Sequence, residues 1–216
     1  MNELEQEIIN DFNMVYYVNN DQTWKNTNWM GVSLQKFPTD LWIYQEILYE
    51  VRPDLIIETG TLYGGSAYYM AHLCDVLGNG RIITIDNNAY GDNIKTARPF
   101  HQRISYVFGS STDPEIVKRV KDSINPNMRV LVVLDSDHSK SHVLNEMNIY
   151  NKFVTKDSYL IVEDSNINGH PVVVGFGPGP YEAIDEFLST NTEFIADRSK
   201  EKFMLTSNPK GYLKKI

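Results

Sequence analysis

Apolar residues recur at close to helical spacing between residues 2 and 19, which predicts an amphipathic helix near the start of the chain. The stretch from Trp24 to Pro38 is polar and has no regular period. A second helix is predicted from Pro38 to Val51, because proline is favoured in the first turn of a helix and apolar residues follow it at helical spacing.

The pattern changes after Pro53, where short apolar runs alternate with helix-like segments. The predicted strands are Leu55–Ile57, Ile82–Ile85, Ile104–Phe108, Val130–Leu134 and Tyr159–Val162. The predicted helices between them are Ser66–Leu77, Asn93–Gln102, Pro114–Ser123 and His138–Phe153. Short β-branched runs separated by helices form βαβ units, which build a parallel sheet with helices on both faces.

The last part of the chain predicts a helix after Pro180 and two weaker strands, at 193–196 and 202–206, which would form an antiparallel edge. The sequence therefore predicts a Rossmann-like α/β fold, with a mostly parallel sheet and an antiparallel edge. A chain of 216 residues fits one such domain. We expect residues 53–216 to form its core and residues 1–52 to form a helical segment, or lid, packed on that core.

Charge and composition narrow the range of partners. The chain carries 20 Lys and Arg against 28 Asp and Glu, and this net charge of −8 argues against nucleic acid or an anionic membrane as a partner. The single cysteine, Cys74, excludes an internal disulfide and lies in an apolar helical pattern that predicts burial. The apolar runs are strand-sized and the acidic start lacks a signal-peptide pattern, so we expect a cytoplasmic protein without membrane insertion.

Candidate chemistry begins at the end of the first predicted strand, which reads ETGTLYGGS from Glu58 to Ser66. Glycines allow the backbone to turn tightly and to approach a ligand at the start of the next helix. The carboxylate of Glu58 would repel a pyrophosphate, whereas it would attract the sulfonium and amino groups of S-adenosylmethionine. The alternative, a strand-to-helix turn without a ligand, becomes less favoured once the next strand end is considered.

The next two strand ends add polar groups to the same edge of the sheet. Asp86 offers a carboxylate for the two ribose hydroxyls, and Ser110 offers a small polar group for an adenine edge. The predicted residues for binding S-adenosylmethionine are Glu58, Gly60, Thr61, Tyr63, Gly64, Ser66, Asp86, Ser110 and Asp135.

The fourth and fifth predicted strands end in acidic stretches, LDSDHSK from Leu134 and VEDSN from Val162. Four carboxylates at neighbouring strand ends would repel one another unless a cation lies among them, and carboxylate oxygens favour Mg²⁺ over zinc. Helix capping by Asp137 and a turn over residues 163–166 are the structural alternatives. Lys140 is the candidate general base, because a metal ion and a sulfonium nearby would lower the pKa of its ammonium group.

A zinc site is a second possibility for the same region. His138, His142 and Glu146 are spaced at i, i+4 and i+8, so they would share one helix face if the helix began at His138. The HExxH pattern is absent, because Ser139 stands where the glutamate would be.

Several strings in the chain resemble the cephalosporin hydroxylase family, notably GVSLQKFPTDLW from Gly31, VEDSNINGHP from Val162 and FGPGP from Phe176. The resemblance covers roughly residues 28–210. It implies the fold of S-adenosylmethionine-dependent methyltransferases, and the family includes rhamnosyl O-methyltransferases. The acidic stretch is also similar to the Asp-His-x-Lys stretch of catechol O-methyltransferase, which implies that Asp137 is a metal ligand and Lys140 the base.

The resemblance and the residues together predict an Mg²⁺-dependent O-methyltransferase that acts on a hydroxyl of a sugar, glycan or secondary metabolite. The predicted metal ligands are Asp137, Glu163 and Asp164, with Asp135 left open as the alternative to Asp137, and the predicted catalytic residues are Lys140, Asp137 and His138. Two other functions stay open, an antibiotic-tailoring hydroxylase or its accessory protein and a non-catalytic protein that binds S-adenosylmethionine.

The N-terminal segment adds two weaker expectations. Its aromatic residues Trp24, Trp29 and Phe37 either form a lid or sugar-stacking wall or simply pack on the sheet. Its apolar helix predicts a homo-oligomer, because the core is already complete from Pro53 onward.

Overall fold

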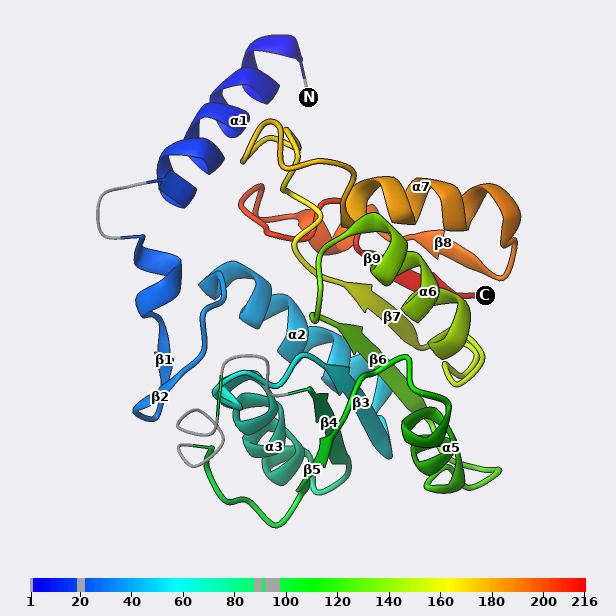
Figure 1. Cartoon of the computed structure of the whole chain (residues 1–216). Coiled ribbons are helices and arrows are strands. Elements are labelled where there is room, and N and C mark those ends of the chain that lie inside the picture. The colour runs from blue at the N-terminus through cyan, green and yellow to red at the C-terminus, as the bar shows by residue number, and fades with distance from the viewer. Residues whose placement is uncertain (1, 19–21, 88–90, 92–97) are drawn as a thin grey trace.

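A seven-stranded sheet forms the centre of the computed structural model, which describes residues 2–18, 22–87, 91 and 98–216 (Figure 1). Its strands are β3 (Leu55–Thr59), β4 (Arg81–Asp86), β5 (Ile104–Phe108), β6 (Val130–Leu134), β7 (Tyr159–Val162), β8 (Phe194–Ala196) and β9 (Tyr212–Lys215). The spatial order is β5-β4-β3-β6-β7-β9-β8. Neighbouring strands from β5 to β7 are parallel, whereas β9 runs antiparallel to β7 and β8. The predicted fold class is therefore confirmed.

The order of the strands reverses beside β3, because the chain proceeds outward to β4 and β5 on one side and to β6 and β7 on the other. Ligands of open α/β sheets bind beyond the carboxyl ends of the strands at such a point. Thr59 at the end of β3 is paired with Ile85 on β4 and Leu134 on β6, so the three strands end at the same level.

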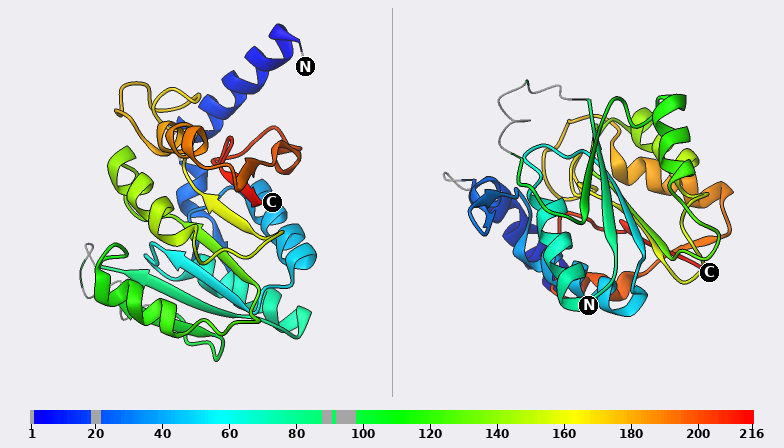
Figure 2. Two further views of the ribbon diagram at one scale, coloured as in Figure 1. Left: turned by 90° about the vertical axis from the view of Figure 1, so that its right-hand side faces the viewer. Right: turned by 90° about the horizontal axis from the view of Figure 1, so that it is seen from below.

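Two hydrophobic clusters cover the two faces of the sheet (Figures 1 and 2). One contains residues of α5 (Pro114–Asp122), α6 (Lys140–Tyr150) and α7 (Pro180–Thr190), and the other contains residues of α2 (Pro38–Val51) and α3 (Gly65–Leu77). Successive strand residues alternate between the clusters, as Ile56 and Ile57 do. This double coverage explains why the central strands consist of continuous apolar runs.

The N-terminal part divides into a projecting helix and a buried one. Helix α1 (Glu3–Val18) extends away from the sheet, and η1 (Thr23–Asn26) and the antiparallel strands β1 (Asn28–Trp29) and β2 (Val32–Ser33) follow it (Figure 1). Helix α2 starts at Pro38 as predicted and buries Ile47 and its neighbours in the core. The second half of the predicted N-terminal segment is thus part of the core.

Two predicted elements differ from the structure. Residues 202–206 were expected to form a strand, but they follow η2 (Arg198–Glu201) without strand structure, and β9 pairs between β7 and the edge strand β8 instead. The reason is Asp40, a buried carboxylate that accepts hydrogen bonds from the Thr206 hydroxyl (2.5 Å) and the Ser207 backbone (2.8 Å) and holds this stretch away from the sheet. The helix predicted at 93–102 falls largely outside the described residues, and residues 98–102 are not helical.

The remaining elements match within a few residues at their ends. In the described ranges no helix is long and apolar enough to span a bilayer. Cys74 is free and buried within α3, as its position in the helical pattern predicted.

Candidate active site

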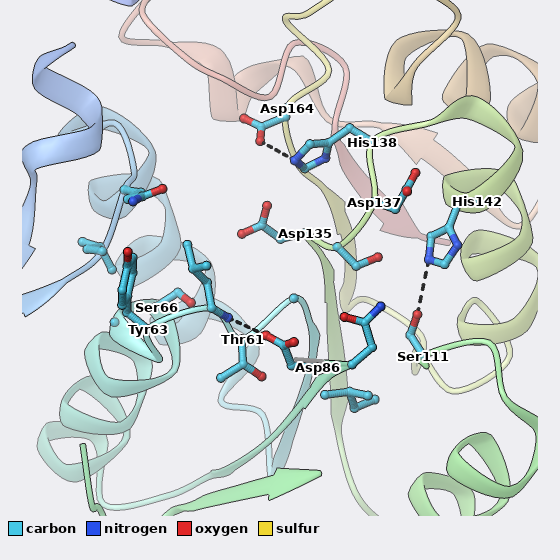
Figure 3. Close-up of a pocket in the computed structure, with 18 of the residues that line it drawn as sticks. Thr61, Tyr63, Ser66, Asp86, Ser111, Asp135, Asp137, His138, His142 and Asp164 are labelled. Carbon is cyan, nitrogen blue, oxygen red and sulfur yellow. Dashed lines mark hydrogen bonds and ion pairs between the residues drawn. The ribbon is translucent and has the colours of Figure 1, made fainter. Parts of the chain in front are cut away.

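A cavity of about 660 Å³ opens beyond the carboxyl ends of the parallel strands (Figure 3). The turns after β3, β4 and β5 line one end of it, and the turns after β6 and β7 line the other. Tyr17 and Trp24 close one wall from the N-terminal part, where their rings stack with centroids 5.0 Å apart. The cavity therefore brings both groups of predicted site residues to one place.

Glycines are required in the turn after β3 by the backbone itself. Gly60 has a φ of +85°, and a Cβ there would lie 1.7 Å from the carbonyl oxygen of Asp135. Gly64 also has a positive φ, and a Cβ on Gly65 would lie 2.1 Å from the carbonyl oxygen of Ser33. Other residues would strain or displace the turn, so these glycines keep the turn close to its neighbours and open to a ligand.

Glu58 lies beneath this turn and not on the cavity wall. Its carboxylate accepts hydrogen bonds from the hydroxyls of Ser66 (2.5 Å) and Thr84 (2.6 Å). Burial raises the pKa of Glu58 to about 7, although both hydroxyls oppose this shift. Glu58 thus braces the turn through Ser66, which itself lines the cavity.

Asp86 lines the cavity at the end of β4 and is tied to the glycine turn. Its Oδ2 accepts hydrogen bonds from the Leu62 backbone and from Nη2 of Arg98, both at 2.8 Å. Nε of Arg98 also donates to the Leu62 carbonyl at 2.8 Å. No sequence motif singles out Arg98, because the arginine contacts the turn from a segment 36 residues further along the chain. The predicted residues Thr61, Tyr63 and Ser110 also line this end of the cavity.

Three side chains of kinds that bind metal ions lie close together at the end of the cavity beside β6 and β7. Within the described residues, Asp135, His138 and Asp164 each offer an atom within 4.8 Å of the others, and all three are partly exposed. Nε2 of His138 lies 3.1 Å from Oδ2 of Asp164. Burial, supported by the nearby charge of Asp164, raises the pKa of Asp135. A cluster of two carboxylates and one imidazole is not the 2-His-1-carboxylate set of non-haem iron hydroxylases.

Two predicted metal ligands do not join this cluster. Asp137 lines the cavity, but its carboxylate accepts a hydrogen bond from the Ser139 backbone (2.7 Å), and Ser139 lowers the pKa of Asp137. Glu163 is buried behind Asp135 and is bonded to the ammonium of Lys36 and the hydroxyl of Tyr44. Asp164 alone of the three predicted ligands belongs to the cluster.

Lys36 was not singled out by the sequence, although it lies within the string GVSLQKFPTDLW. Its Nζ lies 2.7 Å from Oδ2 of Asp135 and also contacts Glu163, and its side chain is almost fully buried. Burial lowers the pKa of Lys36, but the charges of Asp135 and Glu163 outweigh that effect and raise it well above its ordinary value. An isolated lysine in a polar stretch carries no signal that would predict this.

The predicted base, Lys140, begins α6 but points away from the cluster. Its Nζ lies 2.7 Å from Oε2 of Glu186, and Lys140 does not line the cavity. The zinc alternative assumed a helix that begins at His138, whereas α6 begins at Lys140, so His138 pairs with Asp164 and His142 lies near Glu146 (3.4 Å).

The aromatic residues of the N-terminal part have different roles. Phe37 is buried against Tyr16, and Trp29 packs against Tyr69 with ring centroids 4.9 Å apart. Only Trp24 of the three predicted wall residues lines the cavity.

A sheet of this topology, with a glycine turn, an acidic residue at the next strand end and an acidic cluster on one cavity, is typical of S-adenosylmethionine-dependent methyltransferases. Comparison with known proteins identifies the family to which the chain belongs. The family model described as "Rhamnosyl O-methyltransferase/CmcI" matches residues 21–216, and the chain belongs to this family.

Individual relatives agree with the family model. The chain is 41% identical over 213 residues to a rhamnosyl O-methyltransferase of Mycobacterium tuberculosis, covering 95% of this chain and 84% of that one. It is 37% identical to a rhamnosyl O-methyltransferase of Mycobacterium leprae, covering 95% and 90%. The solved structure "cmcI-D160 Mg-SAM" shares the fold, with a TM-score of 0.65 at 18% identity over 89% of this chain and 77% of that one.

Proposed function

We propose that this enzyme transfers a methyl group from S-adenosylmethionine to a hydroxyl of a rhamnosyl-type sugar, and that it uses a divalent cation, Mg²⁺, to do so. One observation carries the proposal: the glycine turn with Asp86 and the acidic cluster open onto the same cavity (Figure 3). The names of the mycobacterial relatives support the sugar acceptor, and the CmcI structure with Mg and SAM supports the two ligands.

The methyl donor would occupy the end of the cavity beside β3 and β4. Gly60 and Gly65 line the cavity, so the donor can approach the backbone there, and Ser66 lies at the N-terminus of α3, where backbone N–H groups suit a carboxylate. The carboxylate of Asp86 would accept hydrogen bonds from the ribose hydroxyls, and Tyr63 and Ser110 would complete the wall. Glu58 would act through the turn that it braces.

The donor atoms at the other end fit a hard divalent cation. Mg²⁺ prefers carboxylate oxygens and keeps several waters, and Asp135 and Asp164 supply such oxygens from adjacent strand ends. We therefore assign Asp135 and Asp164 as ligands, and we choose Asp135 over Asp137 because Asp135 lies in the cluster with Asp164, whereas Asp137 does not. A cation bound there would lower the pKa of the acceptor hydroxyl.

His138 is the side chain best placed to take the proton from the acceptor. Its imidazole lines the cavity and is oriented by the carboxylate of Asp164, whereas Lys140 is paired with Glu186 outside. The deprotonated oxygen attacks the methyl carbon as the carbon–sulfur bond breaks, and the electron pair of that bond stays on sulfur. The products are the methyl ether and S-adenosylhomocysteine, with the proton on His138.

Assembly into a homo-oligomer stays a prediction. Helix α1 exposes an apolar stripe at Leu4, Ile8, Val15 and Val18, each more than half exposed, and a second copy would cover it. A monomeric mass in light scattering at micromolar concentration would refute this expectation.

The test of the proposed function is the formation of S-adenosylhomocysteine from S-adenosylmethionine with a panel of rhamnosides. Deoxy-rhamnosides that lack one hydroxyl each serve as controls, and the one that lacks the methylated hydroxyl should give no product. Asp86→Ala should weaken cofactor binding by roughly 1–3 kcal/mol, as expected for lost hydrogen bonds to a charged group. Product formation from none of the rhamnosides, with the cofactor bound, would refute the acceptor class.

A further inference from the structure

A buried glutamate, Glu146 of α6, lies beside the turn that follows β6. Its side chain is fully buried, and its Oε1 accepts a hydrogen bond from the hydroxyl of Ser136 at 2.8 Å. Within the described residues its Oε2 has no hydrogen-bond partner. A buried carboxylate that is only partly satisfied destabilises a fold. Neither the proposed metal site nor the proposed proton transfer uses Glu146, so its presence calls for another role.

Glu146 reaches the cavity through His142, which lies one helical turn before it. Nε2 of His142 lies 3.4 Å from Oε1 of Glu146 and 3.4 Å from Oγ of Ser111, which follows β5 (Figure 3). His142 and Ser111 line the cavity, whereas Glu146 does not. The phenol of Tyr150 donates a hydrogen bond to the Ser111 carbonyl at 2.7 Å and so fixes the Ser111 backbone. These contacts connect a buried charge to the cavity wall.

The carboxylate of Glu146 determines where His142 carries its proton. Because a carboxylate only accepts hydrogen bonds, the contact favours the imidazole with hydrogen on Nε2. The Ser111 oxygen then accepts from this N–H group, and its own hydroxyl hydrogen is free to donate into the cavity. Hydrogen bonding to Glu146 raises the pKa of His142 against the effect of burial, and the charge of Asp137, in the turn after β6, acts in the same direction.

We propose that Glu146 and His142 are positioning residues that orient the Ser111 hydroxyl, so that this end of the cavity selects the adenine base of the methyl donor. The hydroxyl would donate to N1 of adenine, which accepts a hydrogen bond. A base with a 6-carbonyl group carries hydrogen on N1, and two donors would then face each other. The inference rests on the proposed function, which places the ribose at Asp86, a residue paired with Phe108 on β5 just before the turn that holds Ser111.

The alternative is that Glu146 and His142 form an ordinary ion pair that stabilises α6. The chain offers a matched control in Glu182 and His170, because Oε1 of Glu182 lies 2.9 Å from Nε2 of His170. Neither of these two residues lines the cavity. Glu182→Gln therefore removes the charge of a glutamate–histidine pair without changing the site.

The experiment measures, by calorimetry on the full-length protein, the Kd of S-adenosylhomocysteine and of S-inosylhomocysteine, which has the 6-carbonyl base. At about pH 8, where an ordinary imidazole is neutral, the wild type should prefer the adenosyl compound. Glu146→Gln keeps an acceptor for Ser136, and it should reduce this preference roughly 10-fold, as expected for one hydrogen bond. Glu182→Gln should keep the preference, and turnover at saturating S-adenosylmethionine should change little in both variants.

Two further measurements separate positioning from a structural effect. Ser111→Ala should lose the same preference, and the addition of Glu146→Gln to it should cause no further loss. Lowering the pH to about 5.5 protonates His142 in Glu146→Gln, which returns hydrogen to Nε2 and should restore the preference. If Glu146→Gln does not fold, the same double-mutant comparison is made with His142→Ala in its place.

An unchanged preference in Glu146→Gln, an equal loss in Glu182→Gln, or additive losses in the double variant would overturn the inference. A wild type that binds both compounds equally would also overturn it. Asp86→Ala tests the proposed function separately, because unchanged affinity of that variant for S-adenosylhomocysteine would refute the proposed donor site itself.

Discussion

The two ends of the cavity are each backed by a buried glutamate, but the two carboxylates are satisfied in different ways. Glu58 accepts hydrogen bonds from two neutral hydroxyls, and its pKa is raised to about 7. Glu163 contacts an ammonium and a phenol that both come from the N-terminal part. Glu58, beside β3 and β4, is thus satisfied by residues that follow Pro53, whereas Glu163, beside the acidic cluster, depends on residues that precede Pro53 in the sequence.

Removal of divalent ions should produce the largest difference between the two ends. We expect EDTA to reduce methyl transfer to background and Mg²⁺ to restore it, because the acceptor hydroxyl would otherwise keep nearly its solution pKa. Binding of S-adenosylmethionine, measured by calorimetry, should change little. An enzyme that stays fully active in EDTA would mean that the acidic cluster is structural.

Asp135 and Asp137 lie two residues apart and provide a matched pair within the acidic end. Asp135→Asn should lower turnover by about 100-fold or more, because it removes a charged ligand. Asp137→Asn should lower it only a few-fold, because an asparagine oxygen still accepts from the Ser139 backbone. The turnover numbers of the two variants are compared by steady-state kinetics at saturating Mg²⁺. A larger loss in Asp137→Asn than in Asp135→Asn would indicate that Asp137 is the ligand.

His138 and Lys140 form a second pair, which separates proton transfer from surface charge. His138→Ala should reduce turnover by about 10²-fold, in line with general-base contributions. Lys140→Ala should have an effect of only a few-fold, since its ammonium is paired with Glu186. The rate constants for methyl transfer in single-turnover experiments check this prediction. A larger loss in Lys140→Ala than in His138→Ala would indicate that Lys140 is the base.

Glu58→Gln tests the end of the cavity beside β3 and β4, through the pH dependence of the free energy of unfolding. Because the folded-state pKa of about 7 lies above the ordinary value of 4.5, folded Glu58 holds its proton where the unfolded chain has lost it. The stability that Glu58 contributes is therefore complete below about pH 4.5 and is lost as pH rises through 7. This loss amounts to roughly 3 kcal/mol, and the glutamine variant should not show it.

Urea unfolding of both proteins across this range gives the comparison. Asp40, whose pKa is raised to about 6 by burial, adds its own slope to each curve, so the difference between the proteins isolates Glu58. Parallel curves would show that Glu58 ionises normally in the folded state.

The sequence predicted most of the fold, because alternation of apolar runs and helical segments is a local property of the chain. It also predicted that Asp86 and Asp164 follow strand ends at one edge of the sheet, and both line the cavity there. It did not predict the partners of Glu163, since Lys36 lies 127 residues away from it along the chain. Nor did it predict that Thr206 and Ser207 donate hydrogen bonds to Asp40, or that β9 lies between β7 and β8. Long-range ion pairs and hydrogen bonds of this kind produce no periodic pattern in the sequence, so they could not be predicted from it.

The missing side chain of Gly60 has a consequence for how such an enzyme changes over time. Because a Cβ on Gly60 would lie 1.7 Å from the carbonyl oxygen of Asp135, main-chain contact sets the separation between the turn after β3 and the end of β6. Val173 and Phe176 line the cavity from the loop before α7 and take no part in this contact. We therefore expect such residues to diverge between relatives, and with them the choice of acceptor, while the spacing of the two strand ends is inherited.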